Sequence, residues 1–207
     1  MKLLFLCSAK DAASTPCRAV GRAPELSVGP HEWVRATEGA ADEPGVIGFR
    51  LQHDTIDDLL ARVPGAAPEA IVVWQPGYQA LPTGLDATPI PVVACYSDWN
   101  LVMPDQAGML DAFDYLFTDR AGVRVLQAMG HGNAEFWPMW GHDPEFTTVL
   151  PGVPKHWDIG MIGNLNPVVQ RERAPWLARV ARLADRFRVR IAGGVHGEEY
   201  VRTLNAT

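Results

Sequence analysis

Polar side chains gather in residues 96–100, directly after the apolar run of residues 91–95. The apolar run has the composition of a buried strand, so the polar segment stands at its carboxyl end, where open α/β sheets bind ligands. There Asp98 is a candidate catalytic residue that holds a ligand hydroxyl or acts as a base, and Trp99 is a candidate platform on which a ligand ring can stack. The alternative is that Asp98 or Ser97 caps a turn and that Trp99 belongs to the core.

Two more strands are expected at residues 159–162 and 187–192, and each ends in a glycine turn. Such turns at the carboxyl ends of parallel strands expose backbone amides, and a following helix N-terminus favours a phosphate there. We therefore expect a binding site for a phosphorylated ligand, with His196 within reach of a diphosphate. Its candidate contacts are Gly163, Asn164, Gly193, Gly194 and His196.

The local signatures of several other chemistries are missing. The six histidines show no metal-ligand spacing and the three cysteines contain no Cys-x-x-Cys pair, so no metal site is expected and a reducing cytoplasm fits best. No Gly-x-Ser-x-Gly elbow or Walker loop is found, and no G-x-G-x-x-G follows the first predicted strand, which disfavours a nucleotide-cofactor oxidoreductase. The net charge of -6 disfavours a nucleic-acid partner. No stretch approaches the roughly 20 apolar residues of a membrane helix.

Strands and helices are expected to alternate through the first 150 residues, which predicts an α/β fold, a Rossmann-like parallel sheet with helices on both faces. The expected strands are residues 2–7, 46–51, 70–74, 91–95, 114–117 and 134–139. The expected helices are a short piece near Trp33, one capped by Asp54 or Thr55 and running to Val63, one capped by Asp105 and running to Phe113, and one capped by Thr118 or Asp119 and ending at Gly130.

A proline-rich stretch at residues 143–155 interrupts this alternation and is expected to link two domains, residues 1–150 and residues 157–207. In the second domain Pro167 opens a helical pattern, and a last helix is expected at residues 198–204. Two strands and two helices bury too little apolar area to be stable alone. The second domain is therefore expected either to pack on the first or to be incomplete. We favour a chain truncated at its carboxyl end, because residues 205–207 contain no helix stop signal.

Four segments resemble a known family: residues 114–118 (Asp-Tyr-Leu-Phe-Thr), 138–144 (Pro-Met-Trp-Gly-His-Asp-Pro), 158–166 (Asp-Ile-Gly-Met-Ile-Gly-Asn-Leu-Asn) and 192–198 (Ala-Gly-Gly-Val-His-Gly-Glu). With them the chain resembles the spore-maturation type of group 1 glycosyltransferases, well over its second half and in outline over its first. The resemblance implies the GT-B architecture, two Rossmann-like domains facing each other across a cleft. It further implies a glycosyltransferase whose N-terminal domain holds the glycan or other hydroxylated acceptor and whose C-terminal domain holds a nucleotide-sugar donor.

In such an enzyme backbone amides and cations stabilise the departing nucleoside diphosphate, and the Gly163 and Gly193 turns are expected to approach the donor. The family's later acidic pair and phosphate-binding basic residues would lie past Thr207. We therefore expect little or no sugar transfer by this chain. The alternative from another class is a non-catalytic module, a glycosyltransferase remnant that binds a glycan or a partner through an exposed sheet edge.

Overall fold

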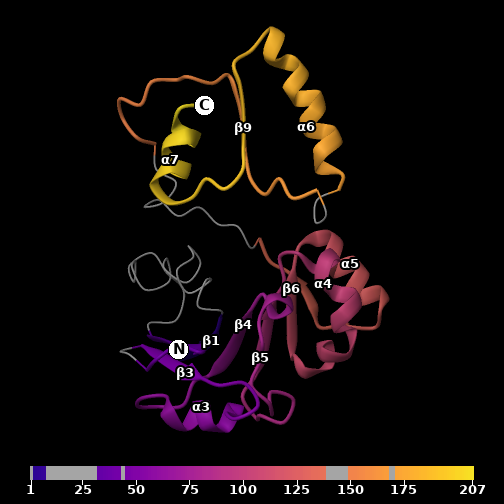
Figure 1. The fold of residues 1–207 in the computed structure, drawn as a ribbon. Helices are drawn as coiled ribbons and strands as arrows, with labels where there is room; N and C mark the ends of the chain where they lie inside the picture. The colour runs from indigo at the N-terminus through magenta and orange to yellow at the C-terminus, as the bar shows by residue number, and fades with distance from the viewer. Residues whose placement is uncertain (1, 8–31, 43–44, 139–148, 168–170) are drawn as a thin grey trace. The chain divides into compact units, whose positions relative to one another are not determined.

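The computed structural model describes residues 2–7, 32–42, 45–138, 149–167 and 171–207 (Figure 1). The chain consists of two compact units, Met1–Gly141 and His142–Thr207. The first unit contains a seven-stranded parallel sheet and the second a pair of parallel strands. The chain is thus an α/β protein with a Rossmann-like first unit, and the two units divide before the expected linker. Residues 143–148 of that linker lie outside the described residues.

The strands of the first unit lie in the order β3-β2-β1-β4-β5-β6-β7, and all neighbours are parallel. Because β1 has β2 on one side and β4 on the other, the chain extends the sheet in one direction up to β3 and in the opposite direction from β4 onward. Sheets of this kind bind ligands at the carboxyl ends of the strands where the direction reverses. The strands are β1 (Lys2–Leu6), β2 (Glu32–Glu38), β3 (Val46–Phe49), β4 (Ala70–Trp74), β5 (Val92–Cys95), β6 (Tyr115–Thr118) and β7 (Ala134–Phe136).

Two helices of this unit begin at side-chain caps that the sequence predicts. Thr55 caps α3 with a capping box: its Oγ1 accepts from the Asp58 amide at 3.2 Å, and the Asp58 carboxylate accepts from the Thr55 amide at 2.8 Å. Asp119 caps α5 by accepting from the Gly122 amide at 2.7 Å. The helical segments described in this unit are α3 (Ile56–Arg62), η1 (Pro76–Tyr78), α4 (Trp99–Gln106), η2 (Ala107–Ala112) and α5 (Arg120–Ala128).

The main core lies on one face of the sheet, where α3, η2 and α5 pack. Its buried residues include Ile56 and Leu59 of α3, Leu110 of η2, Leu126 of α5, and Leu4, Leu6, Ile71, Val73, Val92, Ala94 and Leu116 of the strands. Strand side chains alternate between faces, so their neighbours form a smaller buried cluster on the opposite face: Phe5, Cys7, Trp74 and Cys95. Helices are expected on both faces of this sheet, but the described helices that contribute buried residues cover one.

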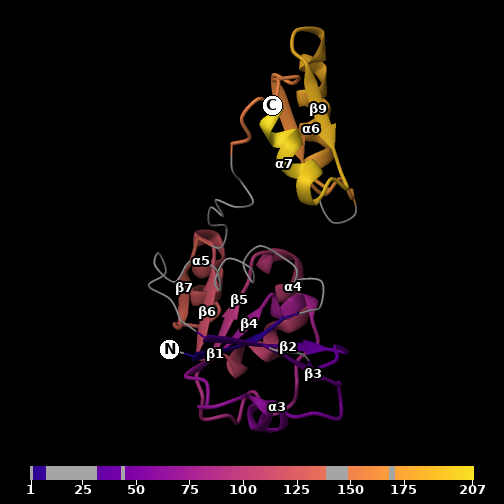
Figure 2. The same ribbon diagram turned by 90° about the vertical axis from the view of Figure 1, so that its left-hand side faces the viewer.

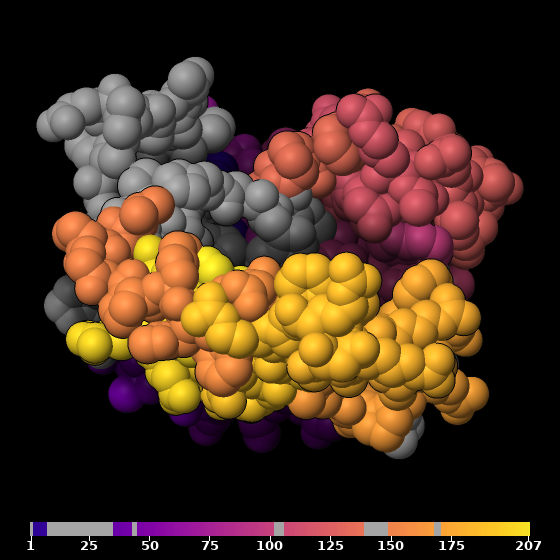
Figure 3. Space-filling model, turned by 90° about the horizontal axis from the view of Figure 1, so that it is seen from above, coloured from indigo at the N-terminus to yellow at the C-terminus, as the bar shows by residue number. Residues whose placement is uncertain are grey.

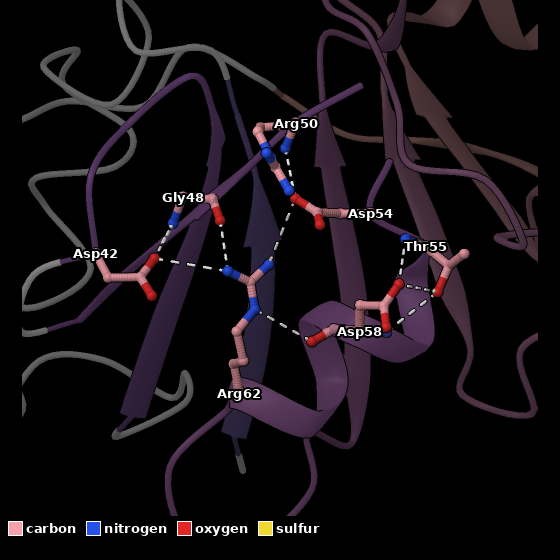
Figure 4. A network of polar contacts seen from close by, with 7 residues as sticks. All are labelled: Asp42, Gly48, Arg50, Asp54, Thr55, Asp58 and Arg62. Carbon is pink, nitrogen blue, oxygen red and sulfur yellow. Dashed lines mark hydrogen bonds and ion pairs between the residues drawn. The ribbon is translucent and has the colours of Figure 1, made fainter. Parts of the chain in front are cut away.

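Arg62 ties α3 to the strand before it (Figure 4). Its Nη1 donates to the Gly48 carbonyl at 2.8 Å and lies 3.7 Å from Asp42 Oδ1, and its Nη2 lies 3.9 Å from Asp54 Oδ2. Its Nε donates to the Asp58 carbonyl at 3.2 Å. Since the Arg62 side chain is 35% exposed, the two ion pairs contribute little free energy, and the bonds to backbone carbonyls hold the arginine in place. We therefore assign this network a role in holding α3 against β3 and not in binding a ligand.

In the second unit β8 (Ile159–Ile162) and β9 (Val189–Ala192) are parallel, and α6 (Arg173–Ala181) and α7 (Gly197–Asn205) lie on opposite sides of the pair (Figure 1 and Figure 2). The short helix η3 (Arg182–Asp185) continues α6. Both helices are amphipathic sequences that follow a strand and a glycine turn, as in one half of a Rossmann-like domain.

Few apolar side chains of the second unit are buried. Among its described residues the buried ones are Ala192, Val195 and Ala206, and α6 contains none. Trp176 of α6 is 61% exposed, and the atoms of α6 lie on the surface of this unit in Figure 3. The apolar stripe of α6 therefore has little to pack against within the unit, in agreement with the expectation that this domain has a small core.

Three local expectations are wrong. Trp33 lies in β2 and not in a helical piece, because pairing with β1 and β3 on both sides outweighs the local sequence preference. The helix expected to start at Asp105 begins earlier, since α4 starts at Trp99, where the Leu101 amide donates to the Asp98 carbonyl at 2.9 Å. The helix expected from Pro167 begins at Arg173, and residues 168–170 lie outside the described residues.

Candidate functional site

The carboxyl ends of β1 and β4 are joined by the side chain of Gln79. Its Nε2 donates to the Leu6 carbonyl at 3.2 Å and to the Trp74 carbonyl at 2.5 Å. Both carbonyls end strands that flank the point where the sheet changes direction. The amide of Gln79 thus satisfies two backbone acceptors at the edge where a doubly wound sheet binds ligands.

Gln75, the residue directly after β4, has a left-handed backbone with φ 53° and ψ 57°. Its side chain is buried and joins the next strand: Oε1 accepts from the Ser97 amide at 3.3 Å, and Nε2 donates to Ser97 Oγ. A non-glycine residue in this region costs roughly 1–3 kcal/mol, and its surroundings must hold it there. Such strain concentrates at functional sites, which makes the end of β4 the first place to look for one.

Tyr78 and Asp98 form a pair beside these residues. The Tyr78 hydroxyl donates to Asp98 Oδ2 at 3.3 Å, and the tyrosine is 51% exposed. Partial burial and then the charge of Asp98 raise the pKa of Tyr78, so the phenol keeps its proton at neutral pH and remains a donor. Asp98 precedes α4 but makes no side-chain cap, and among the described residues its carboxylate accepts only from Tyr78. The carboxylate is therefore available to a ligand.

The contacts of Trp99 fit the alternative that this residue belongs to the core. Its ring packs against the main core, and its Nε1 donates to Asp119 Oδ1 at 3.1 Å. The same Asp119 oxygen caps α5 through the Gly122 amide. Trp99 is thus held by the core and by the cap of α5, so its ring does not serve as a free stacking surface.

The two glycine turns of the second unit lie side by side at the carboxyl ends of β8 and β9. The Gly163 amide donates to the Ala192 carbonyl at 3.1 Å. A Cβ on Gly193 would stand 3.0 Å from Leu165 Cγ and 3.3 Å from the Gly163 carbonyl oxygen, so a larger residue there would push the neighbouring turn away by a few tenths of an ångström. Gly194 has a left-handed φ of 68°. The structure therefore brings Gly163 and Gly193 together.

Asn164 and His196 stand at the same edge with different surroundings. Asn164 Oδ1 accepts from the Asn166 amide at 2.8 Å, and the Asn164 carbonyl accepts from Arg173 Nη1 at 2.6 Å. His196 is exposed at the start of α7 and makes no cap bond, while the first turn of that helix contains the acidic Glu198 and Glu199. These carboxylates oppose a diphosphate at α7, whereas the arginine favours one at the Gly163 turn.

Sequence reasoning gave little weight to the residues that support these sites. Gln75 and Tyr78 belong to a Gln-Pro-Gly-Tyr segment that reads as a common turn, and Ser97 reads as a cap. Arg173 reads as part of a solvated basic face, although it is the first residue of the helix after the Gly163 turn. A cation at that helical position after a glycine turn is the signal that would have identified it.

No group of three or more His, Cys, Asp or Glu side chains that can hold a metal ion is found within residues 2–7, 32–42, 45–138, 149–167 and 171–207. Over the same ranges no helix has both the length and the apolar character that crossing a membrane requires. Comparison of the chain with protein-family models, with curated proteins and with solved structures finds no match.

Proposed function

We propose that this chain belongs to a GT-B glycosyltransferase, in which the first unit binds a hydroxylated acceptor and the second unit binds a nucleotide-sugar donor. The observation that carries the proposal is the pair of adjacent glycine turns at the carboxyl ends of β8 and β9, with the Arg173 guanidinium bonded to the Asn164 carbonyl. Glycine turns of parallel strands admit a phosphate close to the backbone, and an arginine balances its charge.

On the acceptor side, Asp98 is the proposed catalytic residue. Its carboxylate has the chemistry to accept a hydrogen bond from an acceptor hydroxyl and to draw off the proton as that hydroxyl attacks the donor sugar. The Tyr78 hydroxyl, which donates to Asp98 Oδ2, holds the carboxylate in place. In the donor unit, Arg173 and the turns at Gly163 and Gly193 would stabilise the departing nucleoside diphosphate.

We further propose that the donor unit needs additional polypeptide around it to work. The support is its small core: Trp176, Leu183 and Phe187 are each more than a third exposed, while its described buried residues are two alanines and a valine. A unit with so little buried apolar area can bind a nucleotide at its turns but does not hold the donor sugar rigidly enough for transfer. The 207-residue chain is therefore expected to transfer little or no sugar. A reducing cytoplasm suits the buried thiol of Cys95.

Isothermal titration of the chain with UDP, GDP and their sugar conjugates tests the donor half. Nucleotide binding is expected, and Arg173→Gln should weaken it roughly tenfold, the loss of one charge-assisted hydrogen bond. Arg179→Gln is the matched control on the same helix, because the Arg179 guanidinium lies over the Trp176 ring, 4.6 Å from its centroid. Equal effects of the two variants, or no nucleotide binding, would contradict the donor role.

The small core of the second unit favours one alternative, a glycan-binding module without transfer. Binding of a glycan to the first unit with no nucleotide binding to the second would support it. Transfer of sugar to any acceptor by the purified chain would instead overturn the expectation that the chain is inactive.

A further inference from the structure

We propose that Ser97 and Asp98 form a two-point site for a pair of vicinal hydroxyls on a sugar, and that Gln75 holds this site in place. The inference rests on the proposed function and names the chemistry of its acceptor: a sugar ring or similar polyol, bound through two neighbouring hydroxyl groups at the carboxyl end of β5. Ser97 supplies a hydrogen-bond donor and Asp98 supplies a hydrogen-bond acceptor.

The contacts of Ser97 make its hydroxyl the hydrogen-bond donor of this site. Its Oγ accepts from Gln75 Nε2, and its backbone amide donates to Gln75 Oε1 at 3.3 Å. Because the lone pair facing Gln75 is occupied, the Ser97 hydroxyl can use its own hydrogen only toward another acceptor. No acceptor for that hydrogen is found among the described residues. Ser97 is partly exposed, so this hydrogen is available to a ligand.

The hydrogen-bond acceptor of this site is the carboxylate of the next residue, Asp98. Asp98 is partly exposed and receives one hydrogen bond at Oδ2 from the Tyr78 hydroxyl, which leaves room for a second donor on its carboxylate. A donor and an anionic acceptor on adjacent residues match two neighbouring hydroxyls, of which one accepts and the other donates. The same carboxylate repels phosphates and carboxylic acids, which makes an uncharged polyol the fitting ligand.

Gln75 makes the arrangement rigid. Both ends of its side-chain amide are used on Ser97, its side chain is buried, and its backbone is one of two left-handed non-glycine positions among the described residues. Gln52 is the other, with φ 63°, on an exposed turn. A strained backbone kept beside a side chain that fully engages its neighbour is expected of a positioning residue.

The test is nuclear magnetic resonance of the full chain labelled with ¹⁵N, titrated with methyl α-glucoside, methyl α-mannoside and methyl α-galactoside. At least one glycoside should shift the Ser97 and Asp98 amides in a saturable way. Tetrahydropyran-2-methanol, a ring with a single hydroxyl, should not. Ser97→Ala and Gln75→Met should each weaken binding roughly tenfold, the worth of one lost hydrogen bond. Gln52→Met is the matched control and should bind as the wild type does.

The proposal is overturned if no glycoside shifts these two amides, if the single-hydroxyl ring binds equally well, or if Ser97→Ala leaves the affinity unchanged. Spectra of the free variants distinguish a local effect from unfolding, since peaks of β1 and β6 should keep their positions. Glycoside binding without nucleotide binding would uphold this site while contradicting the transferase. Nucleotide binding that depends on Arg173, with no glycoside binding, would support the donor role of the second unit and contradict the site at Ser97 and Asp98.

Discussion

Replacing Gly122 by alanine sets two opposite effects against each other at one position under the candidate acceptor site. Gly122 is the third residue of α5, and its backbone is not left-handed, so alanine fits the helical conformation. The space around Gly122, however, is too small for a methyl group. A Cβ at this position would stand 2.7 Å from both Thr118 Cγ2 and Thr118 Oγ1, and 2.8 Å from Trp99 Cδ1.

The relative sizes of these two effects decide whether Gly122→Ala raises or lowers the free energy of unfolding. Glycine to alanine inside a helix gains up to about 1 kcal/mol of intrinsic helix propensity. Forcing an extra methyl into a well-packed site costs about 1–3 kcal/mol. Thr118 is fully buried and cannot swing away, and the Trp99 ring is held by its bond to Asp119. We therefore expect Gly122→Ala to lower the free energy of unfolding by about 1 kcal/mol or more, which lowers the melting temperature by roughly 2–4 °C per kcal/mol.

The assay is thermal and urea unfolding of the full chain followed by circular dichroism, with Gly108→Ala as the matched control. Among the residues that the structure describes, none lies within 4 Å of a Cβ built on Gly108, so that variant should stay within about 0.5 kcal/mol of the wild type. Thr118→Ala should partly rescue Gly122→Ala, because it removes two of the clashing atoms and Thr118 Oγ1 has no hydrogen-bond partner to lose in the described part of the chain. A Gly122→Ala chain as stable as the wild type would refute the reasoning.

Three other predictions concern stability and reactivity. Thr55→Ala should destabilise the first unit by about 1 kcal/mol in urea unfolding through loss of the α3 cap, and Thr55→Ser should not; equal losses would exclude the cap as the cause. Hydrogen bonds from Arg188 lower the pKa of Asp158 to about 2 from its ordinary 3.8, so the stability it contributes is present above pH 3.8 and is lost as the pH falls toward 2. Asp158→Asn should remove that part of the acid dependence of melting, and an unchanged pH profile would contradict the assignment. Burial raises the pKa of Cys95 to about 12, so iodoacetamide at pH 8 should modify this thiol far more slowly in the folded chain than in urea, as mass spectrometry would report; equal rates would mean that the thiol is accessible.

The sequence by itself determined the strands that are apolar enough to be buried and the helices that carry their own caps. The apolar runs at β1, β4 and β5 and the cap of α3 at Thr55 depend on residues within one element. Local side-chain chemistry fixes such features before any distant contact forms. The glycine turns after β8 and β9 were predictable for the same reason, because a turn is specified by its own few residues.

Tertiary structure alone decided β2 and the contacts of the candidate acceptor site. β2 is a strand because β1 and β3 pair with it on both sides, which no local pattern records. Gln75 and Ser97 are 22 residues apart in sequence, and Tyr78 and Asp98 are 20 apart. They meet because parallel pairing of β4 with β5 brings both carboxyl ends to one edge of the sheet. Residue type therefore made Asp98 a candidate, but only the pairing of the strands supplied the residues that surround it.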